Sequence, residues 1–109
     1  SEVELMSMPE PFVVRIITDE PTPVVELTGE LDMAVSESTW QTVKPLVDGA
    51  GTELVLDVAG LTFIDSRGLS VLARMLEALD GGPLRVRGAS DRVRHLFEVS
   101  GLDEYLVLE

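Results

Sequence analysis

Runs of hydrophobic residues with a strand-like spacing mark four segments of the chain. Residues 12–18 (FVVRIIT) and 24–28 (VVELT) are rich in β-branched residues and flank the turn-like segment DEPTP. They predict a β-hairpin whose second strand ends at Gly29. Residues 53–58 (ELVLDV) are almost wholly apolar, as expected of a central strand that is covered on both faces. Residues 84–87 (LRVR) alternate like a strand with one solvated face.

A helical spacing begins at Ser36. Trp40, Val43 and Val47 recur at intervals that place them on one face of a helix, so Trp40 is expected in the core. Ser36 is the expected N-cap of this helix. An interior proline costs a helix about 3 kcal/mol, so Pro45 predicts a kink or an early end.

Two further helices are predicted in the second half of the chain. The strongest pattern covers residues 66–79, where a broad apolar stripe leaves a narrow polar face, and Ser66 is its expected N-cap. The sequence DGGP then ends it. A third helix follows Ser90 as its cap and ends before Gly101. Residues 105–108 predict either a last short strand or a segment that docks on the core.

The order of these elements predicts the fold class. A starting hairpin followed by alternating helices and strands indicates an α/β domain with a mixed sheet, parallel in its middle and connected by right-handed crossovers. A chain of 109 residues fits one such domain. We expect it to span residues 12–109, preceded by a flexible tail at residues 1–11.

Composition and charge narrow the possible functions. The formal net charge of −12 makes the chain a poor candidate for binding nucleic acid or an anionic membrane surface. It would attract a partner with a basic face. The chain has no cysteine, which excludes disulfides and thiolate zinc sites and fits a reducing compartment. The longest apolar stretch is too short to span a bilayer and no signal segment is visible, so we expect a cytoplasmic protein. We also expect no cofactor and no metal.

The segment with the most specific chemistry is residues 64–69 (IDSRGL), where a loop leaves the central strand and Ser66 stands at the start of the strongest helix. A helix start has unpaired N–H groups and partial positive charge, which would tolerate a phosphate. Serine is also a common N-cap, and most N-cap serines are never modified. The motif Asp-Ser-x-Gly alone therefore does not define a modification site.

A resemblance over most of the chain supports the modification. Residues 27–32 (LTGELD) and 54–69 (LVLDVAGLTFIDSRGL) resemble the STAS domain of anti-sigma factor antagonists. Residues 92–97 (RVRHLF) and 100–102 (SGL) are similar to the closing helix of that family. The resemblance runs in order from about residue 12 to the end of the chain.

The resemblance implies a four- to five-stranded sheet flanked by helices, and a binding protein rather than an enzyme, with no catalytic residue. In that family the serine that matches Ser66 is phosphorylated by the anti-sigma factor, an ATP-dependent serine kinase. The unmodified antagonist binds this kinase and frees a sigma factor, and a serine phosphatase resets the serine. Asp65, Arg67 and Gly68 would shape the loop, with Asp32 close to it. Arg67 stands where many relatives have a small residue, so the contact with the kinase is expected to differ.

Several alternatives remain open for individual residues. Asp32 could equally be an ordinary turn or cap residue. Asp57 could belong to the network around the loop or simply end its strand. His95, the only histidine, is a poor basis for a metal site or a catalytic role.

Other classes of protein fit less well. A phospho-aspartate receiver domain needs an acidic pair after its first strand and a lysine after its last; the single lysine is Lys44, in a predicted helix. A serine hydrolase would need a glycine where Ile64 stands. The main alternative has the same fold: a STAS scaffold, or a lipid-transport or nucleotide-responsive module, that does not act on a sigma factor.

Overall fold

The computed structural model describes residues 12–49, 53–80 and 83–109. Its elements follow in the order β1 (Val13–Ile17), β2 (Val24–Leu31), α2 (Met33–Gly49), β3 (Leu54–Ile64), α3 (Ser66–Ala78), β4 (Leu84–Arg87), α4 (Asp91–Ser100), the 3-10 helix η1 (Leu102–Tyr105) and β5 (Leu106–Leu108). The predicted tail at residues 1–11 lies outside the described residues.

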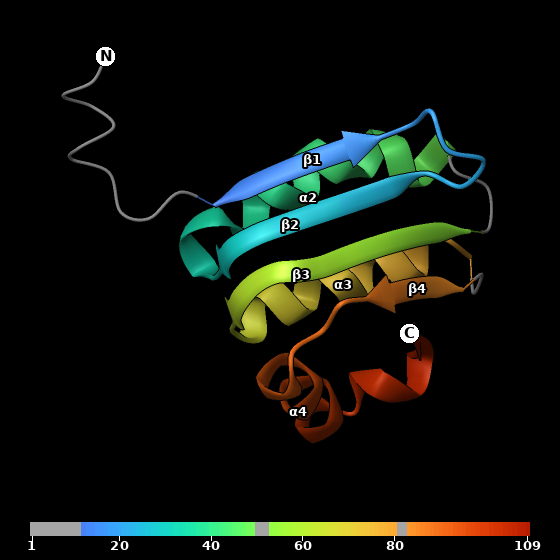
Figure 1. Cartoon of the computed structure of the whole chain (residues 1–109). Helices are drawn as coiled ribbons and strands as arrows, with labels where there is room; N and C mark the ends of the chain where they lie inside the picture. Colours follow the sequence, from blue (N-terminus) through green and yellow to red (C-terminus); the bar gives the residue numbers. More distant parts are fainter. Residues whose placement is uncertain (1–11, 50–52, 81–82) are drawn as a thin grey trace, which may run out of the picture.

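One sheet of five strands forms the centre of the domain, in the order β1-β2-β3-β4-β5. β1 is antiparallel to β2, while β2, β3, β4 and β5 are parallel to one another. Figure 1 shows α2 and α3 side by side behind this sheet. The predicted α/β class, the starting hairpin and the parallel middle of the sheet are confirmed, and residues 105–108 contain a true edge strand.

The core lies between the helices and one face of the sheet. Alternate residues of β3, including Leu54, Leu56 and Val58, are buried on this face, and α4 adds Phe97. The expectation that this strand is covered on both faces is wrong. On its second face Val55 and Asp57 are half-exposed, because no helix of the described residues covers this side of β3 (Figure 1). Asp57 instead pairs with Arg87 on a neighbouring strand.

β2 and β3 are both longer than predicted. Gly29 does not end β2: it has a φ of 102° and lies opposite Leu61 at a register shift in the pairing with β3. Gly60 marks the same irregular region, since a Cβ atom there would lie 2.8 Å from Oγ1 of Thr28. Glycines in a strand commonly mark such a bulge or close approach. Both strands therefore continue to the same edge of the sheet and end at Leu31 and Ile64.

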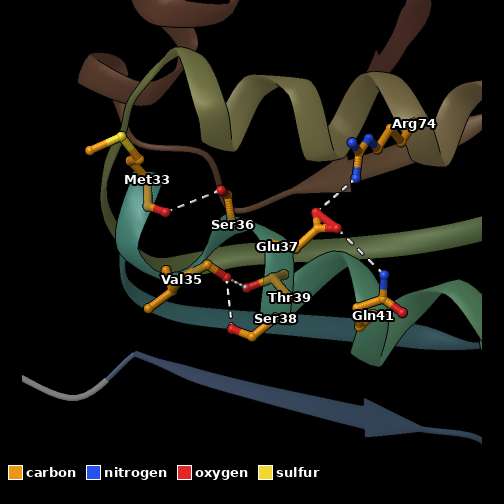
Figure 2. Close-up of polar contacts among 8 residues, drawn as sticks. All are labelled: Met33, Val35, Ser36, Glu37, Ser38, Thr39, Gln41 and Arg74. Atoms are coloured by element: carbon orange, nitrogen blue, oxygen red, sulfur yellow. Dashed lines mark hydrogen bonds and ion pairs between the residues drawn. The ribbon is translucent and has the colours of Figure 1, made fainter.

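α2 also differs from its prediction at both ends. It begins at Met33 rather than after Ser36, whose hydroxyl instead donates to the carbonyl of Met33 at 3.4 Å (Figure 2). Pro45 does not end the helix, which continues to Gly49. The proline is exposed, so its ring does not displace any core side chain. Trp40 is half-buried against the core, as expected.

The helices of the second half agree with prediction more closely. α3 occupies residues 66–78, one residue less than expected, and α4 begins after Ser90, whose hydroxyl accepts a hydrogen bond from the N–H of Val93 at 3.2 Å. Gly101 ends α4 with a φ of 79°. No helix in the described part of the chain is long and apolar enough to cross a membrane.

Replacing Pro45 by alanine should stabilise the domain. The new residue would supply an N–H that can donate to the carbonyl of Gln41, and alanine is the better helix former, so we expect the free energy of unfolding to rise by ~1–3 kcal/mol. Urea unfolding measures this change. The control Glu77→Ala, at an exposed position of α3, should change stability by less than about 0.5 kcal/mol. Destabilisation by Pro45→Ala would contradict the prediction.

Candidate functional site

The carboxyl ends of β2 and β3 meet at one edge of the sheet. Leu31 and Ile64, the last residues of these strands, are paired in the parallel register. Each strand is followed by a single aspartate, Asp32 or Asp65, and then directly by a helix. Two helix starts, each with unpaired N–H groups, therefore lie close together.

The carboxylate of Asp65 joins these two helix starts. One oxygen, Oδ1, accepts hydrogen bonds from the N–H groups of Arg67 and Gly68, both at 2.9 Å. The other, Oδ2, accepts from the N–H of Met33 at 3.0 Å, 32 residues away in the chain and at the start of α2. The N–H of Asp65 donates to the carbonyl of Leu31 at 3.2 Å. This one residue caps α3 and also fixes α2 against it.

The expectation that Ser66 caps α3 is wrong. Asp65 is the N-cap, with an extended backbone (φ −102°, ψ −174°), and Ser66 is the first helical residue. A carboxylate has two acceptor oxygens and a negative charge, so it is the stronger partner for N–H groups at the positive end of a helix. The sequence Asp-Ser contains two possible caps, and the stronger acceptor takes the position.

Asp32 lies beside this cap and does the same for α2. Its Oδ1 accepts a hydrogen bond from the N–H of Ala34 at 3.0 Å, and its carbonyl accepts from the N–H of Ser36 at 2.9 Å. The structure thus places Asp32 next to the Asp65 loop and also gives it the ordinary capping role that the sequence left open. Its part in binding a partner stays a prediction.

Gly68 lets α3 approach the end of β2. A Cβ atom at this buried position would lie 2.5 Å from the carbonyl oxygen of Leu31 and 2.7 Å from Cγ1 of Ile64. Any larger residue must therefore push α3 away from the sheet. Because the helix start carries Ser66, the glycine sets the position of that serine relative to α2.

Ser66 itself is exposed, and its hydroxyl takes part in no hydrogen bond with another described residue. The nearest N–H groups of the helix start are already bonded to Asp65. In this conformation these two groups are therefore not free to hold a phosphate on Ser66, whose modification stays a prediction. A phosphate here would project outward, next to a carboxylate.

Two hollows lie on either side of the start of α3. One, of about 380 Å³, lies between α2 and α3, and the other, of about 290 Å³, lies between α3 and the α4–η1 region. Ser66 lines the second hollow and Arg67 lines the first, while Ser70 borders both. Ser66 and Arg67 thus lie on one surface around the start of α3, whereas Gly68 is buried beneath it.

Sequence reasoning missed the residues of α2 and α3 that complete this surface. Glu37 accepts from Nη1 of Arg74 at 3.0 Å, across 37 residues of sequence, and the guanidinium of Arg74 lies 5.6 Å from the ring centroid of Trp40. Figure 2 shows Glu37 and Arg74 facing each other between the two helices. The spacing within one helix cannot reveal a pair between two helices, so no local signal could have found it.

Two other residues weighed in the sequence lie outside this surface. Asp57 is neither part of the loop nor the end of its strand: Oδ2 accepts from Nε of Arg87 on β4 at 3.0 Å. His95 is exposed on α4. Within residues 12–49, 53–80 and 83–109, no group of three or more histidine, aspartate or glutamate side chains is arranged to hold a metal ion.

Comparison with known proteins agrees with this architecture. The family described as "Mlab, STAS domain" matches residues 15–109. The anti-sigma F factor antagonist of Lysinibacillus sphaericus is 34% identical over 100 residues, which cover 88% of this chain and 84% of that protein.

Solved structures of SpoIIAA have the same fold. The anti-sigma factor antagonist SpoIIAA in its unphosphorylated form is 26% identical, with a TM-score of 0.72 over 91% of this chain and 88% of that chain. The Bacillus cell fate determinant SpoIIAA in its phosphorylated form is also 26% identical, with a TM-score of 0.65 over 91% of each chain.

The fold is therefore that of a small STAS-type α/β domain with a five-stranded mixed sheet. The chain belongs to the STAS-domain family that includes the anti-sigma factor antagonists.

Replacing Asp65 by alanine should destabilise the domain strongly. It removes the acceptor of three N–H groups at two helix starts, so we expect a loss of ~2–4 kcal/mol in the free energy of unfolding. Urea unfolding with circular dichroism measures the loss. The matched control is Ser90→Ala, a cap with one hydrogen bond, which should cost ~1 kcal/mol. Equal losses for the two variants would show that Asp65 is only a local cap.

Replacing Gly68 by alanine should also destabilise the domain, for a steric reason. The added methyl group meets backbone and core atoms, and we expect a loss of ~1–3 kcal/mol. The control is Gly49→Ala, at the end of α2, where no atom lies within 4 Å of the added Cβ. This control should leave stability unchanged or raise it by less than about 1 kcal/mol. Thermal unfolding compares the two variants, and a stable Gly68→Ala protein would mean that α3 can move at little cost.

Proposed function

We propose that this protein is an anti-sigma factor antagonist whose phosphorylation site is Ser66. The unphosphorylated form binds an anti-sigma factor, which is also an ATP-dependent serine kinase, and so frees a sigma factor. The main support for this proposal is the position of Ser66. Its hydroxyl is exposed at the start of α3, which Asp65 holds in place, and it forms no hydrogen bond with any described residue. Such a group can be modified without loss of a structural contact.

The fixed backbone around Ser66 supports recognition by a kinase. Asp65 orders the residues on both sides of the serine, so the hydroxyl is presented in one geometry. A preorganised acceptor lowers the entropy cost of binding. In the kinase reaction the hydroxyl oxygen of Ser66 bonds to the γ-phosphorus of ATP, the bond to ADP breaks, and the hydroxyl proton passes to a base of the kinase.

The charge of the phosphate explains why the modified protein would leave its partner. Phosphorylation adds about −1.5 to −2 charges, here beside Asp65 in a chain of net charge −12. In an interface with an effective dielectric constant of ~20, one pair of unit charges ~4 Å apart interacts by ~4 kcal/mol. A loss of even ~3 kcal/mol weakens a complex roughly a hundredfold.

The same geometry explains why the fold would survive modification. A phosphate on Ser66 adds repulsion toward Asp65, but the three hydrogen bonds of Asp65 are made with backbone N–H groups that stay in place. The phosphate is directed to solvent, where water and counter-ions screen it. The change therefore acts on the docking surface. SpoIIAA, which shares the fold, has been solved with and without a phosphate.

The partner assignment rests on the same surface and on the relatives. Proteins of known role that are similar over most of their length are antagonists of anti-sigma factors. An antagonist acts by binding, so no catalytic residue of its own is required. A serine phosphatase would restore the binding form.

Replacing Ser66 by glutamate should leave a folded domain that binds its partner roughly a hundredfold more weakly, because the carboxylate imitates part of the phosphate charge. Ser66→Ala should bind like the wild type and take no phosphate. The control is Ser38→Glu, which adds the same charge at an exposed position of α2 that lines neither hollow.

The experiment begins with a pull-down from the source cell with wild-type and Ser66→Glu baits. Calorimetry on the captured anti-sigma factor then gives the dissociation constants, and mass spectrometry after incubation with ATP locates the phosphate. Undiminished affinity of Ser66→Glu would contradict the switch. The absence of phosphate on Ser66 with every anti-sigma kinase of the cell would favour a STAS scaffold or transport module instead.

A further inference from the structure

The hollow between α2 and α3 differs in charge from the rest of the protein. Arg67 and Arg74 line it from α3, and Glu37 lines it from α2. Two positive groups face one negative group here, whereas the whole chain has 20 acidic and 8 basic residues. The side chains that line the hollow therefore carry one more positive than negative charge, in contrast to the chain as a whole.

The negative group in this hollow is already neutralised. One oxygen of Glu37 accepts from Arg74 at 3.0 Å and the other accepts from Nε2 of Gln41 at 3.5 Å, as Figure 2 shows. Arg74 is in turn held by Glu37 and by the ring of Trp40. Glu37 and Arg74 therefore neutralise each other, and Arg67 has no such partner among the described residues.

Arg67 is the remaining cation. It is exposed, and it forms no ion pair with any carboxylate of the described residues. The surrounding surface is mixed in character: Met33 is 70% exposed, Val71 lies at the base, and Ser36 and Ser70 carry hydroxyl groups. A guanidinium binds a carboxylate through two parallel hydrogen bonds, and hydroxyl groups can donate further ones.

We infer that this hollow receives a glutamate or aspartate side chain of the partner protein, and that Arg67 determines the register of the complex by pairing with it. The methylene groups of such a side chain would pack on Met33 and Val71, which a free inorganic anion could not use. This inference rests on the proposed function, because it places the contact on the same docking surface as Ser66.

The charge pattern favours a protein carboxylate for a further reason. A −12 domain attracts the basic regions of a partner at long range, which raises the rate of association but does not by itself fix one orientation. A pair formed by Arg67 and a carboxylate of the partner has the reverse arrangement of charges. It favours one orientation over the others, because an orientation that places Arg67 against a basic region of the partner brings like charges together. Arg67 would thus add specificity where overall charge adds speed of association.

Arg67 is not placed to neutralise a phosphate on its neighbour. Successive residues of an α-helix point in directions about 100° apart and do not face each other. In agreement, Ser66 lines the hollow toward α4 and η1, while Arg67 lines the hollow toward α2. The two residues should therefore act on binding separately.

The test measures the affinity of the captured anti-sigma factor for Arg67→Glu by calorimetry. We expect a 10- to 100-fold larger dissociation constant. The control Lys44→Glu changes the charge by the same amount on α2, 11 residues from its start and about 16 Å along the helix. At equal salt it should change the constant less than threefold. Thermal unfolding shows whether both variants remain folded.

A charge exchange identifies the partner residue. Acidic residues of the partner that cross-link near Arg67 are replaced by arginine one at a time, and one replacement should restore binding to Arg67→Glu while weakening binding to the wild type. Equal constants for Arg67→Glu and Lys44→Glu would overturn this inference. If, in that case, Ser66→Glu bound the anti-sigma factor more weakly than the wild type, the proposed function would stand and only the inference about Arg67 would fall. Failure of the wild type to form any complex would overturn both.

Discussion

Three hydrogen bonds to the carboxylate of Asp65 fix the geometry of the surface around the start of α3, which includes Ser66 and Arg67. They connect N–H groups of Met33, Arg67 and Gly68, which belong to two helices that are distant in sequence. Parallel strands bring two helix starts to the same edge of a sheet, and like helix dipoles repel there. One negative group between them offsets this repulsion and satisfies donors that would otherwise be unpaired. The proposed docking surface is thus built on an electrostatic requirement of the fold.

The local parts of the fold could be predicted from sequence because their signals are local. The hairpin, α3 and α4 follow from hydrophobic spacing and from caps such as Ser90. The errors arose where a contact with a distant segment overrides a local signal. Gly29 and the residues after Val58 look like strand ends, yet the pairing of β2 with β3 continues past them. Pro45 remains in α2 because that helix packs on the sheet through Val43 and Val47.

In the candidate site, too, local signals could be interpreted from sequence, whereas contacts between distant segments could not. The expectation that Asp32 lies near the segment IDSRGL agrees with the structure, while the functional role of that segment stays a prediction. Sequence alone could not show that Asp65 rather than Ser66 is the cap, since both residues are good caps and the choice depends on the bond to Met33 across 32 residues. Nor could it find the pairing of Glu37 with Arg74, which exists only because two helices pack side by side.

The separation of tasks between two adjacent residues makes a phosphate switch possible here. If Ser66 were the cap, as its position in the sequence suggests, a phosphate on its hydroxyl would replace a structural hydrogen bond and disturb the start of α3. Because Asp65 performs that task, the hydroxyl of Ser66 is not needed for the fold, and a phosphate on it would break no structural hydrogen bond. In the proposed switch, the carboxylate of Asp65 would also occupy two N–H groups of the helix start that could otherwise bind the phosphate. The new charge would then face the protein docked at that surface.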